Sequence, residues 1–111
     1  MQPVRAPTKY GNRKTVVDNI TFASAKEARR YSELKLLERA GEIRFLRTQT
    51  RFPLIVGETQ VAEYWSDFAY IRNADDVQVI EDVKSPITRK NPVYRLKFKI
   101  MAAMGLHIVE V

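Results

Sequence analysis

Three acidic residues and one lysine stand where simple packing gives no reason for a charge. Glu27 belongs to the first turn of a predicted helix, and Asp67 interrupts an aromatic stretch that is typical of a strand. Asp82 and Lys84 end the strand that follows. An aspartate in a central strand is costly unless it is paired or bound to a metal ion. Carboxylates gathered in this way would suit a hard divalent cation, and a neighbouring lysine would stabilise negative charge.

The helix that carries Glu27 is predicted to begin after Ser24 and to run to about Ala40, with Gly41 ending it. Residues 24–27, Ser-Ala-Lys-Glu, match the capping-box pattern. At about 100° per residue, the apolar stripe of this helix points almost in the direction of Glu27, which aims the carboxylate at the sheet. An alternative is that Glu27 only closes the capping box by binding the Ser24 amide. The stripe consists of Ala28, Tyr31, Leu34 and Leu37.

The two strand positions also have plainer interpretations. Asp67 would be unremarkable at a bulge beyond the sheet edge or beside an arginine, and Asp82 with Lys84 would be unremarkable as a surface salt-bridge ladder. Asp82 and Lys84 are two residues apart and therefore share a strand face, whereas Glu81 points the other way. A register slip of one residue would put Glu81 on that face instead. We prefer Asp82 because only Asp82 shares a face with Lys84.

The order of these residues resembles the PD-(D/E)xK nuclease superfamily, in which a helix carboxylate and a strand acid precede a second strand that ends in acid-x-Lys. Ser66 stands where the superfamily's name has a proline, at a position that varies widely. Nearly the whole chain from Tyr10 also resembles a family of small phage and prophage nucleases, catalogued as a domain of unknown function. The segments that carry this likeness are Tyr10–Thr15, Ile20–Ser24, Glu27–Tyr31, Leu34–Ile43, Leu46–Phe52 and Tyr94–Lys97.

The resemblance implies a restriction-endonuclease-like domain that hydrolyses DNA phosphodiester bonds with Mg²⁺ or Mn²⁺. Glu27, Asp67 and Asp82 would hold the metal ion. Lys84 would orient or activate the attacking water, and Gln49 would contact the lysine or the DNA backbone. Small relatives often resolve branched DNA as homodimers, so a Holliday-junction resolvase-like activity and a homodimer are narrower expectations. The implied setting is the cytoplasm of a bacterial host, with the gene carried by a phage or prophage.

Charge and composition agree with a nucleic-acid partner. The chain has a net charge of +6, and residues 1–14 and 84–99 contain lysines and arginines but no acid. This basic frame around an acidic centre suits a protein that grips phosphates and also holds a cation. The alternatives are that the basic residues only confer solubility, or that the chain is a non-catalytic nucleic-acid-binding module. The candidate DNA-binding residues are Arg13, Lys14, Gln49, Arg95 and Lys99.

The chain has no cysteine, which excludes a disulfide scaffold, a thiolate zinc site and a cysteine nucleophile. It has no apolar run of the roughly 18 residues that span a bilayer and no apolar signal segment, so neither a membrane span nor secretion is expected.

His107, the only histidine, is expected to be structural. Leu36 lies opposite the apolar stripe of its helix and is a candidate for an interface. The aromatic residues Tyr64, Trp65, Phe68 and Tyr70 are expected in the core rather than as a base-stacking platform.

The predicted organisation is a flexible basic arm over residues 1–14 and one domain over 15–111. The domain is expected to be α/β, with an N-terminal hairpin and then the order α-β-β-β-α-β, which makes a mixed sheet flanked by helices. Residues 85–90 are expected to form a polar loop, and Val93, Leu96, Ile100 and Met104 to form the apolar stripe of the second helix. The predicted elements are a hairpin over 15–22, strands over 43–56 (interrupted at Pro53), 61–71, 77–84 and 106–111, and helices over 24–40 and 92–104.

Overall fold

The computed structural model describes residues 13–111, so residues 1–12, most of the predicted basic arm, lie outside the described residues. The chain enters through a two-stranded hairpin of β1 (Thr15–Val17) and β2 (Ile20–Phe22). Asp18 and Asn19 form its turn with φ of 52° and 62°. Two positive φ values match a primed hairpin turn, which Asp and Asn tolerate better than most residues. The predicted hairpin is therefore confirmed.

Helix α1 (Ala25–Arg39) begins where the cap signal predicts, because the Ser24 hydroxyl accepts the Glu27 amide at 3.1 Å. Three members of the predicted stripe, Ala28, Tyr31 and Leu34, are buried, and so is Glu27. Leu37 is exposed, so the buried face is confined to the first three turns of the helix.

The main sheet contains four strands in the order β3-β4-β5-β6: β3 (Ile43–Val56), β4 (Thr59–Arg72), β5 (Val77–Asp82) and β6 (Ile108–Glu110). The first three strands pair antiparallel, whereas β5 and β6 pair parallel across a helical crossover. The sheet is mixed and lies between helices, as predicted, and β4 is an interior strand, as its apolar residues on both faces indicated.

Several predicted boundaries are wrong for identifiable reasons. Strand β3 continues through Pro53, which pairs with Glu63, because β3 is an edge strand where a missing donor is tolerated. The irregularities lie between Arg44 and Arg47 and between Leu54 and Ile55. Strand β5 ends two residues early, and β6 is only three residues long, so the exposed His107 lies just before it.

The predicted polar loop at 85–90 contains a short helix, α2 (Pro86–Arg89), which Ser85 caps. A longer helix, α3 (Pro92–Ala103), follows with Asn91 as its cap. The predicted stripe of α3 is wrong in its first half, since Val93 and Leu96 are exposed. Tyr94 and Met101 are buried instead, because the helix presents to the sheet the face that lies one residue further along.

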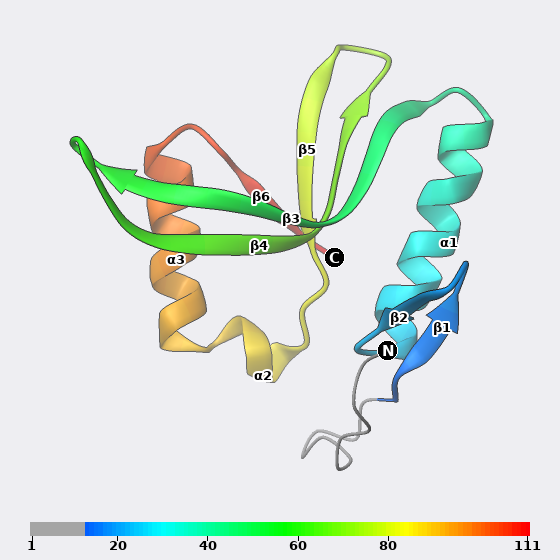
Figure 1. Cartoon of the computed structure of the whole chain (residues 1–111), viewed down its shortest axis with the longest axis horizontal. Helices are drawn as coiled ribbons and strands as arrows, with labels where there is room; N and C mark the ends of the chain where they lie inside the picture. The colour runs from blue at the N-terminus through cyan, green and yellow to red at the C-terminus, as the bar shows by residue number, and fades with distance from the viewer. Residues whose placement is uncertain (1–12) are drawn as a thin grey trace.

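Helices α1 and α3 lie to either side of the sheet (Figure 1), and each covers its own core. The core under α1 includes Phe22, Tyr31, Phe68 and Tyr70, and the core under α3 includes Phe52, Leu54, Tyr64 and Met101. Strand β4 contributes to both cores, with Tyr64 in one and Phe68 in the other. Asp67 lies between these two positions. Among the described residues, no helix has the length and apolar character needed to cross a membrane.

Candidate functional site

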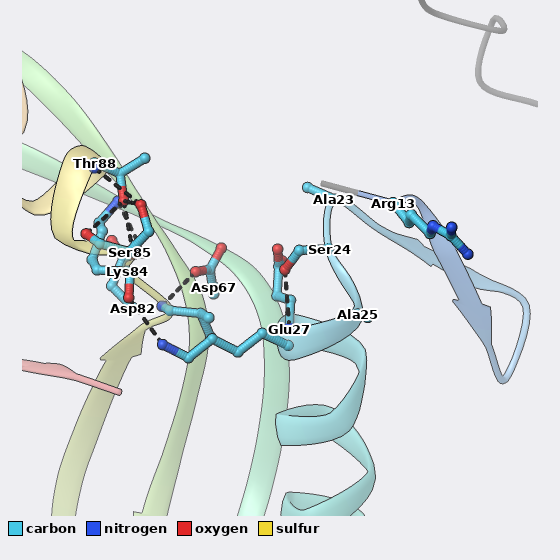
Figure 2. A pocket seen from close by; sticks show the side chains of 12 residues that line it. Arg13, Ala23, Ser24, Ala25, Glu27, Asp67, Asp82, Lys84, Ser85 and Thr88 are labelled. Carbon is cyan, nitrogen blue, oxygen red and sulfur yellow. Dashed lines mark hydrogen bonds and ion pairs between the residues drawn. The ribbon is translucent and has the colours of Figure 1, made fainter. Parts of the chain in front are cut away.

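A cleft of about 450 Å³ opens where the first turn of α1, the middle of β4 and the end of β5 meet (Figure 2). Helix α2 closes its far side with Ser85 and Thr88. All four residues singled out from the sequence line this cleft: Glu27, Asp67, Asp82 and Lys84. In Figure 2 the Asp67 carboxylate stands between Asp82 on one side and Glu27 on the other.

The two strand aspartates are held by specific donors. One Asp67 oxygen accepts the Val83 amide at 2.8 Å, and the other is 3.5 Å from the Gln49 side-chain amide. Asp82 is buried, accepts a hydrogen bond from the Tyr64 hydroxyl, and lies 3.2 Å from the Lys84 ammonium. Among residues 13–111, Asp67 is therefore paired with amides rather than with an arginine, and the Asp82–Lys84 pair is enclosed rather than a surface ladder.

The three carboxyls make ionisation difficult for one another. Burial raises the pKa of Asp82 to about 7, and the neighbouring Asp67 adds to that rise. Burial also raises the pKa of Asp67, with repulsion from Glu27 contributing. The pKa of Glu27 is raised first by burial and further by Asp82. Two adjacent aspartates in a partly dry cleft thus hold a proton more readily than separate ones would.

The Glu27 side chain remains available to the cleft, because only the Glu27 backbone amide takes part in capping α1. Its backbone amide binds Ser24, but its carboxyl neighbours Asp67 and the Ala23 backbone amide. The carboxylate is therefore presented to the cleft from the first turn of α1, where the helix favours negative charge.

Two contacts fix the Lys84 ammonium, and a third fixes its backbone. Its ammonium pairs with Asp82 and lies 4.1 Å from the centroid of the Tyr94 ring, a cation–π contact. Lys26 of α1 donates to the Lys84 carbonyl at 3.0 Å and so ties the segment after β5 to the first helix. The Lys84 side chain keeps 17% of its surface exposed, so the ammonium is confined but still reachable from the cleft.

Glu81 belongs to a different environment, which decides between the two candidate acids of β5. Arg30 grips both Glu81 carboxylate oxygens at 2.7 and 2.6 Å, and the Tyr70 hydroxyl donates to the same carboxylate. Glu81 is 1% exposed, points toward α1 and does not line the cleft. Asp82 is therefore the β5 acid of the site, as its shared face with Lys84 predicted.

Comparison with family models matches residues 7–107 to a family described as "Protein of unknown function (DUF1064)". The chain belongs to the DUF1064 family. The expected membership in a family of unknown function is confirmed, whereas the nuclease assignment stays a prediction. All the elements that build the cleft fall within the matched region of this DUF1064 protein. Comparison with curated proteins and comparison with solved structures give no significant match.

The donor set of this DUF1064 protein suits a small hard cation in part. Among residues 13–111, no three acidic, histidine or cysteine side chains converge closely enough to hold a metal ion as they stand. The carboxyls instead meet in pairs, Glu27 with Asp67 and Asp67 with Asp82. Mg²⁺ is commonly held by one or two carboxylates, with water and substrate phosphates completing its shell. Such a cation would also relieve the repulsion that raises the three pKa values.

The predicted DNA-binding residues fall in different places. Arg13 lines the cleft, on the side of the β1–β2 hairpin (Figure 2), whereas Lys14 is exposed beside it. Gln49 lies opposite Asp67 in β3 and has φ of 50°, a strained value for a residue within a strand. Arg95 and Lys99 lie on the exposed surface of α3 and do not line the carboxylate cleft.

Several side chains of the site were missed by sequence reasoning. Lys26 and Arg30 flank Glu27 on α1, yet a basic residue in an exposed helix turn carries no special signal. Tyr64 and Tyr94 look like ordinary core aromatics, and their hydroxyl and ring contacts exist only once β4, β5 and α3 are brought together. Thr88 was hidden because α2 itself was not foreseen.

Proposed function

We propose that this DUF1064 protein is a metal-dependent DNA endonuclease of the PD-(D/E)xK kind, with Mg²⁺ or Mn²⁺ as its cofactor and a restriction-endonuclease-like core. The observation that carries the proposal is that Glu27, Asp67, Asp82 and Lys84, which come from three separate elements, line one cleft. A charge cluster of this kind, with raised carboxyl pKa values, is typical of a functional site.

Asp67 and Asp82 would be the first carboxylates to hold the cation, with water and substrate phosphate in its remaining positions. When bound, the cation supplies positive charge that offsets charge developing at the phosphate and makes a nearby water more acidic. The free Asp67–Asp82 pair favours retention of a proton, so cation binding near neutral pH would release it. Glu27, buried in the first turn of α1, would complete the ligand set or orient water.

Lys84 would place its ammonium beside the attacked phosphate. Asp82 and the Tyr94 ring fix that ammonium at 3.2 and 4.1 Å before any substrate arrives. A preorganised cation stabilises a developing negative charge without the cost of reorganising solvent. Because the Lys84 side chain is mostly enclosed, its ammonium acts in a less polar setting, where its effect on the phosphate is larger.

DNA is the substrate that the surrounding charge favours. Arg13, Lys26 and Lys84 line the same cleft as the carboxylates and would neutralise backbone phosphates on either side of the cut. A purely binding module with this basic frame would gain nothing from three crowded carboxylates, since they repel phosphate. A Holliday-junction resolvase-like preference for branched DNA and a homodimer are narrower parts of this proposal.

The test is incubation of the protein with linear, nicked and four-way DNA, with and without Mg²⁺. We expect strand cleavage that requires the metal and that Asp67→Asn abolishes. Glu58→Gln, at the exposed turn between β3 and β4, is the matched control and should cleave like the wild type. Wild-type binding without any metal-dependent cleavage of the three DNAs would contradict the proposal and favour the binding module.

A further inference from the structure

A second cleft, of about 490 Å³, continues from the first along β4 to the start of α3. The two clefts share Asp67, Asp82, Lys84 and Thr88, so any ligand in the second lies directly beside the carboxylates. The walls that belong to the second cleft alone include Trp65, Val93 and Lys97. Apart from the shared charged residues, its lining thus adds two apolar side chains and one lysine.

Trp65 differs from the aromatic residues around it. Tyr64, Phe68 and Tyr70 are buried, as the sequence predicts, but Trp65 is 50% exposed. Its indole N–H donates to Glu63 at 3.3 Å, and Glu63 is itself paired with Arg51, so the edge of the ring is anchored although half of the residue's surface stays exposed. An exposed indole that is anchored in a cleft is a feature of binding surfaces rather than of core packing.

The lining contributed by the start of α3 combines an apolar side chain with polar ones. Val93, at the start of α3, is 62% exposed. Asn91 uses its side-chain oxygen to cap α3 through the Val93 and Tyr94 amides at 2.9 and 3.1 Å, which leaves its NH₂ group as a donor. Lys97 adds positive charge one turn further along the helix. An exposed indole and an aliphatic side chain, in a cleft that also has an amide donor and an ammonium, suit a nucleobase attached to a phosphodiester.

We propose that the cleft lined by Trp65 and Val93 takes up an unstacked nucleobase next to the phosphate being cut, so that the preferred substrate is DNA with an unpaired nucleotide at the cleavage site. The proposal rests on the proposed function and specifies its substrate. Bases within an intact duplex are stacked on both faces and cannot reach an indole. A base that is already unpaired avoids the unstacking cost and gains the stacking energy on Trp65.

Trp65 is the only tryptophan in the chain, so its fluorescence reports the proposed contact directly. The experiment titrates the full-length protein in Ca²⁺ with a fully paired linear duplex of two strands and with the same duplex carrying one unpaired nucleotide at its centre. Stacking of a base should quench the emission strongly with the unpaired substrate and only weakly with the paired one. In parallel, anisotropy of labelled DNA gives the affinities of wild type, Trp65→Phe and Trp65→Ala.

We expect Trp65→Ala to weaken binding of the unpaired substrate by on the order of 10-fold and to leave the affinity for the paired duplex nearly unchanged. Trp65→Phe should retain most of the preference because it keeps an aromatic face. Equal quenching by the two DNAs at saturation, or an unchanged preference in Trp65→Ala, would overturn the proposal. If the protein is not a nuclease, it will show no Mg²⁺-dependent cleavage of any DNA. The fluorescence quenching and the DNA affinities can still be measured in that case, so the two proposals fail in distinguishable ways.

Discussion

Arg30 and Glu81 join the first helix to the strand of the site through two hydrogen bonds, from Nε to Oε1 at 2.7 Å and from Nη2 to Oε2 at 2.6 Å. The pair is placed to position the site, because Arg30 lies one turn after Glu27 and Glu81 immediately precedes Asp82. Glu81 is almost fully buried, so Arg30 is the group that neutralises it. We therefore expect the separation between the helix carboxylate and the strand carboxylate to depend on this contact.

Removing Arg30 alone should destabilise the protein strongly. Arg30→Met leaves the Glu81 charge buried without its partner, a change that costs on the order of 3 kcal/mol. Arg30→Met combined with Glu81→Gln removes that charge while keeping an acceptor for Tyr70, and should recover most of the loss. Urea denaturation followed by circular dichroism measures both effects. Arg29→Ala, at the exposed neighbouring position, is the control and should stay within about 0.5 kcal/mol of wild type.

The double variant also separates positioning from stability. We expect it to fold well yet to cleave DNA more slowly than wild type, because α1 is no longer tied to β5. Recovery of wild-type single-turnover cleavage together with stability would show that the Arg30–Glu81 contact only holds the fold.

The sequence predicted the elements of the site better than the contacts between them. Cap and turn signals placed α1 and the hairpin, since Ser24, Asp18 and Asn19 act on neighbouring residues only. Alternation along β5 separated Glu81 from Asp82 correctly. The Arg30–Glu81 pair could not be foreseen, because it joins residues 51 positions apart and depends on how α1 crosses the sheet.

Stability should depend on pH in the metal-free protein. The pKa of Asp82 is about 7 in the folded chain against an ordinary 3.8, and the pKa values of Glu27 and Asp67 are also raised. The folded state thus holds a proton that the unfolded state has released, so the free energy of unfolding should fall as pH rises from 4 to about 7 and then level off. Chemical denaturation between pH 5 and pH 8 measures the slope.

Two variants check the origin of this slope. Asp82→Asn should flatten it, whereas Glu58→Gln should leave it unchanged because that residue is exposed at a distant turn. In the wild type, millimolar Mg²⁺ should raise the melting temperature most at the alkaline end, since it binds the ionised carboxylates of the folded state only. An unaltered slope in Asp82→Asn would place the titrating group elsewhere.

Gln49 should show the signature of backbone strain. Its φ of 50° is favourable for glycine and unfavourable for a residue with a Cβ atom. Gln49→Gly should therefore be more stable than Gln49→Ala by about 1 kcal/mol, although both lose the amide that faces Asp67. At Arg47, where φ is not positive, the order should reverse, with Arg47→Ala more stable than Arg47→Gly. The same order at both positions, measured by urea denaturation, would contradict the strained geometry.

Tyr94 should act on Lys84 mainly through its ring. Tyr94→Phe keeps the aromatic face beneath the ammonium and removes only the hydrogen bond to Glu110 at 2.6 Å. Tyr94→Leu removes both contacts. Single-turnover cleavage should fall by less than about 3-fold in the first variant and by on the order of 10-fold in the second, the scale of one cation–π contact. Equal losses would assign the effect to the hydroxyl rather than to the ring.

Helix α3 shows where prediction from the apolar pattern failed. An apolar stripe through Val93 and Leu96 is as regular as one through Tyr94 and Met101, so periodicity alone could not choose between the two faces. The exposed Val93 lines the same cleft as Trp65. Likewise, the aromatic run in β4 predicts a core correctly for three residues and misses the fourth, because its exposure depends on β3 and α3 together.

Single-turnover cleavage by Lys84→Ala, set against its DNA affinity in Ca²⁺, tests the central claim most directly. The account predicts that cleavage falls by on the order of 100-fold or more while affinity changes by only a few-fold, because Lys84 acts on the transition state. Lys90→Ala, which removes an exposed lysine after α2, should cleave bound DNA at the wild-type rate. Wild-type cleavage by Lys84→Ala, or a loss of affinity that accounts for the whole defect, would contradict the account.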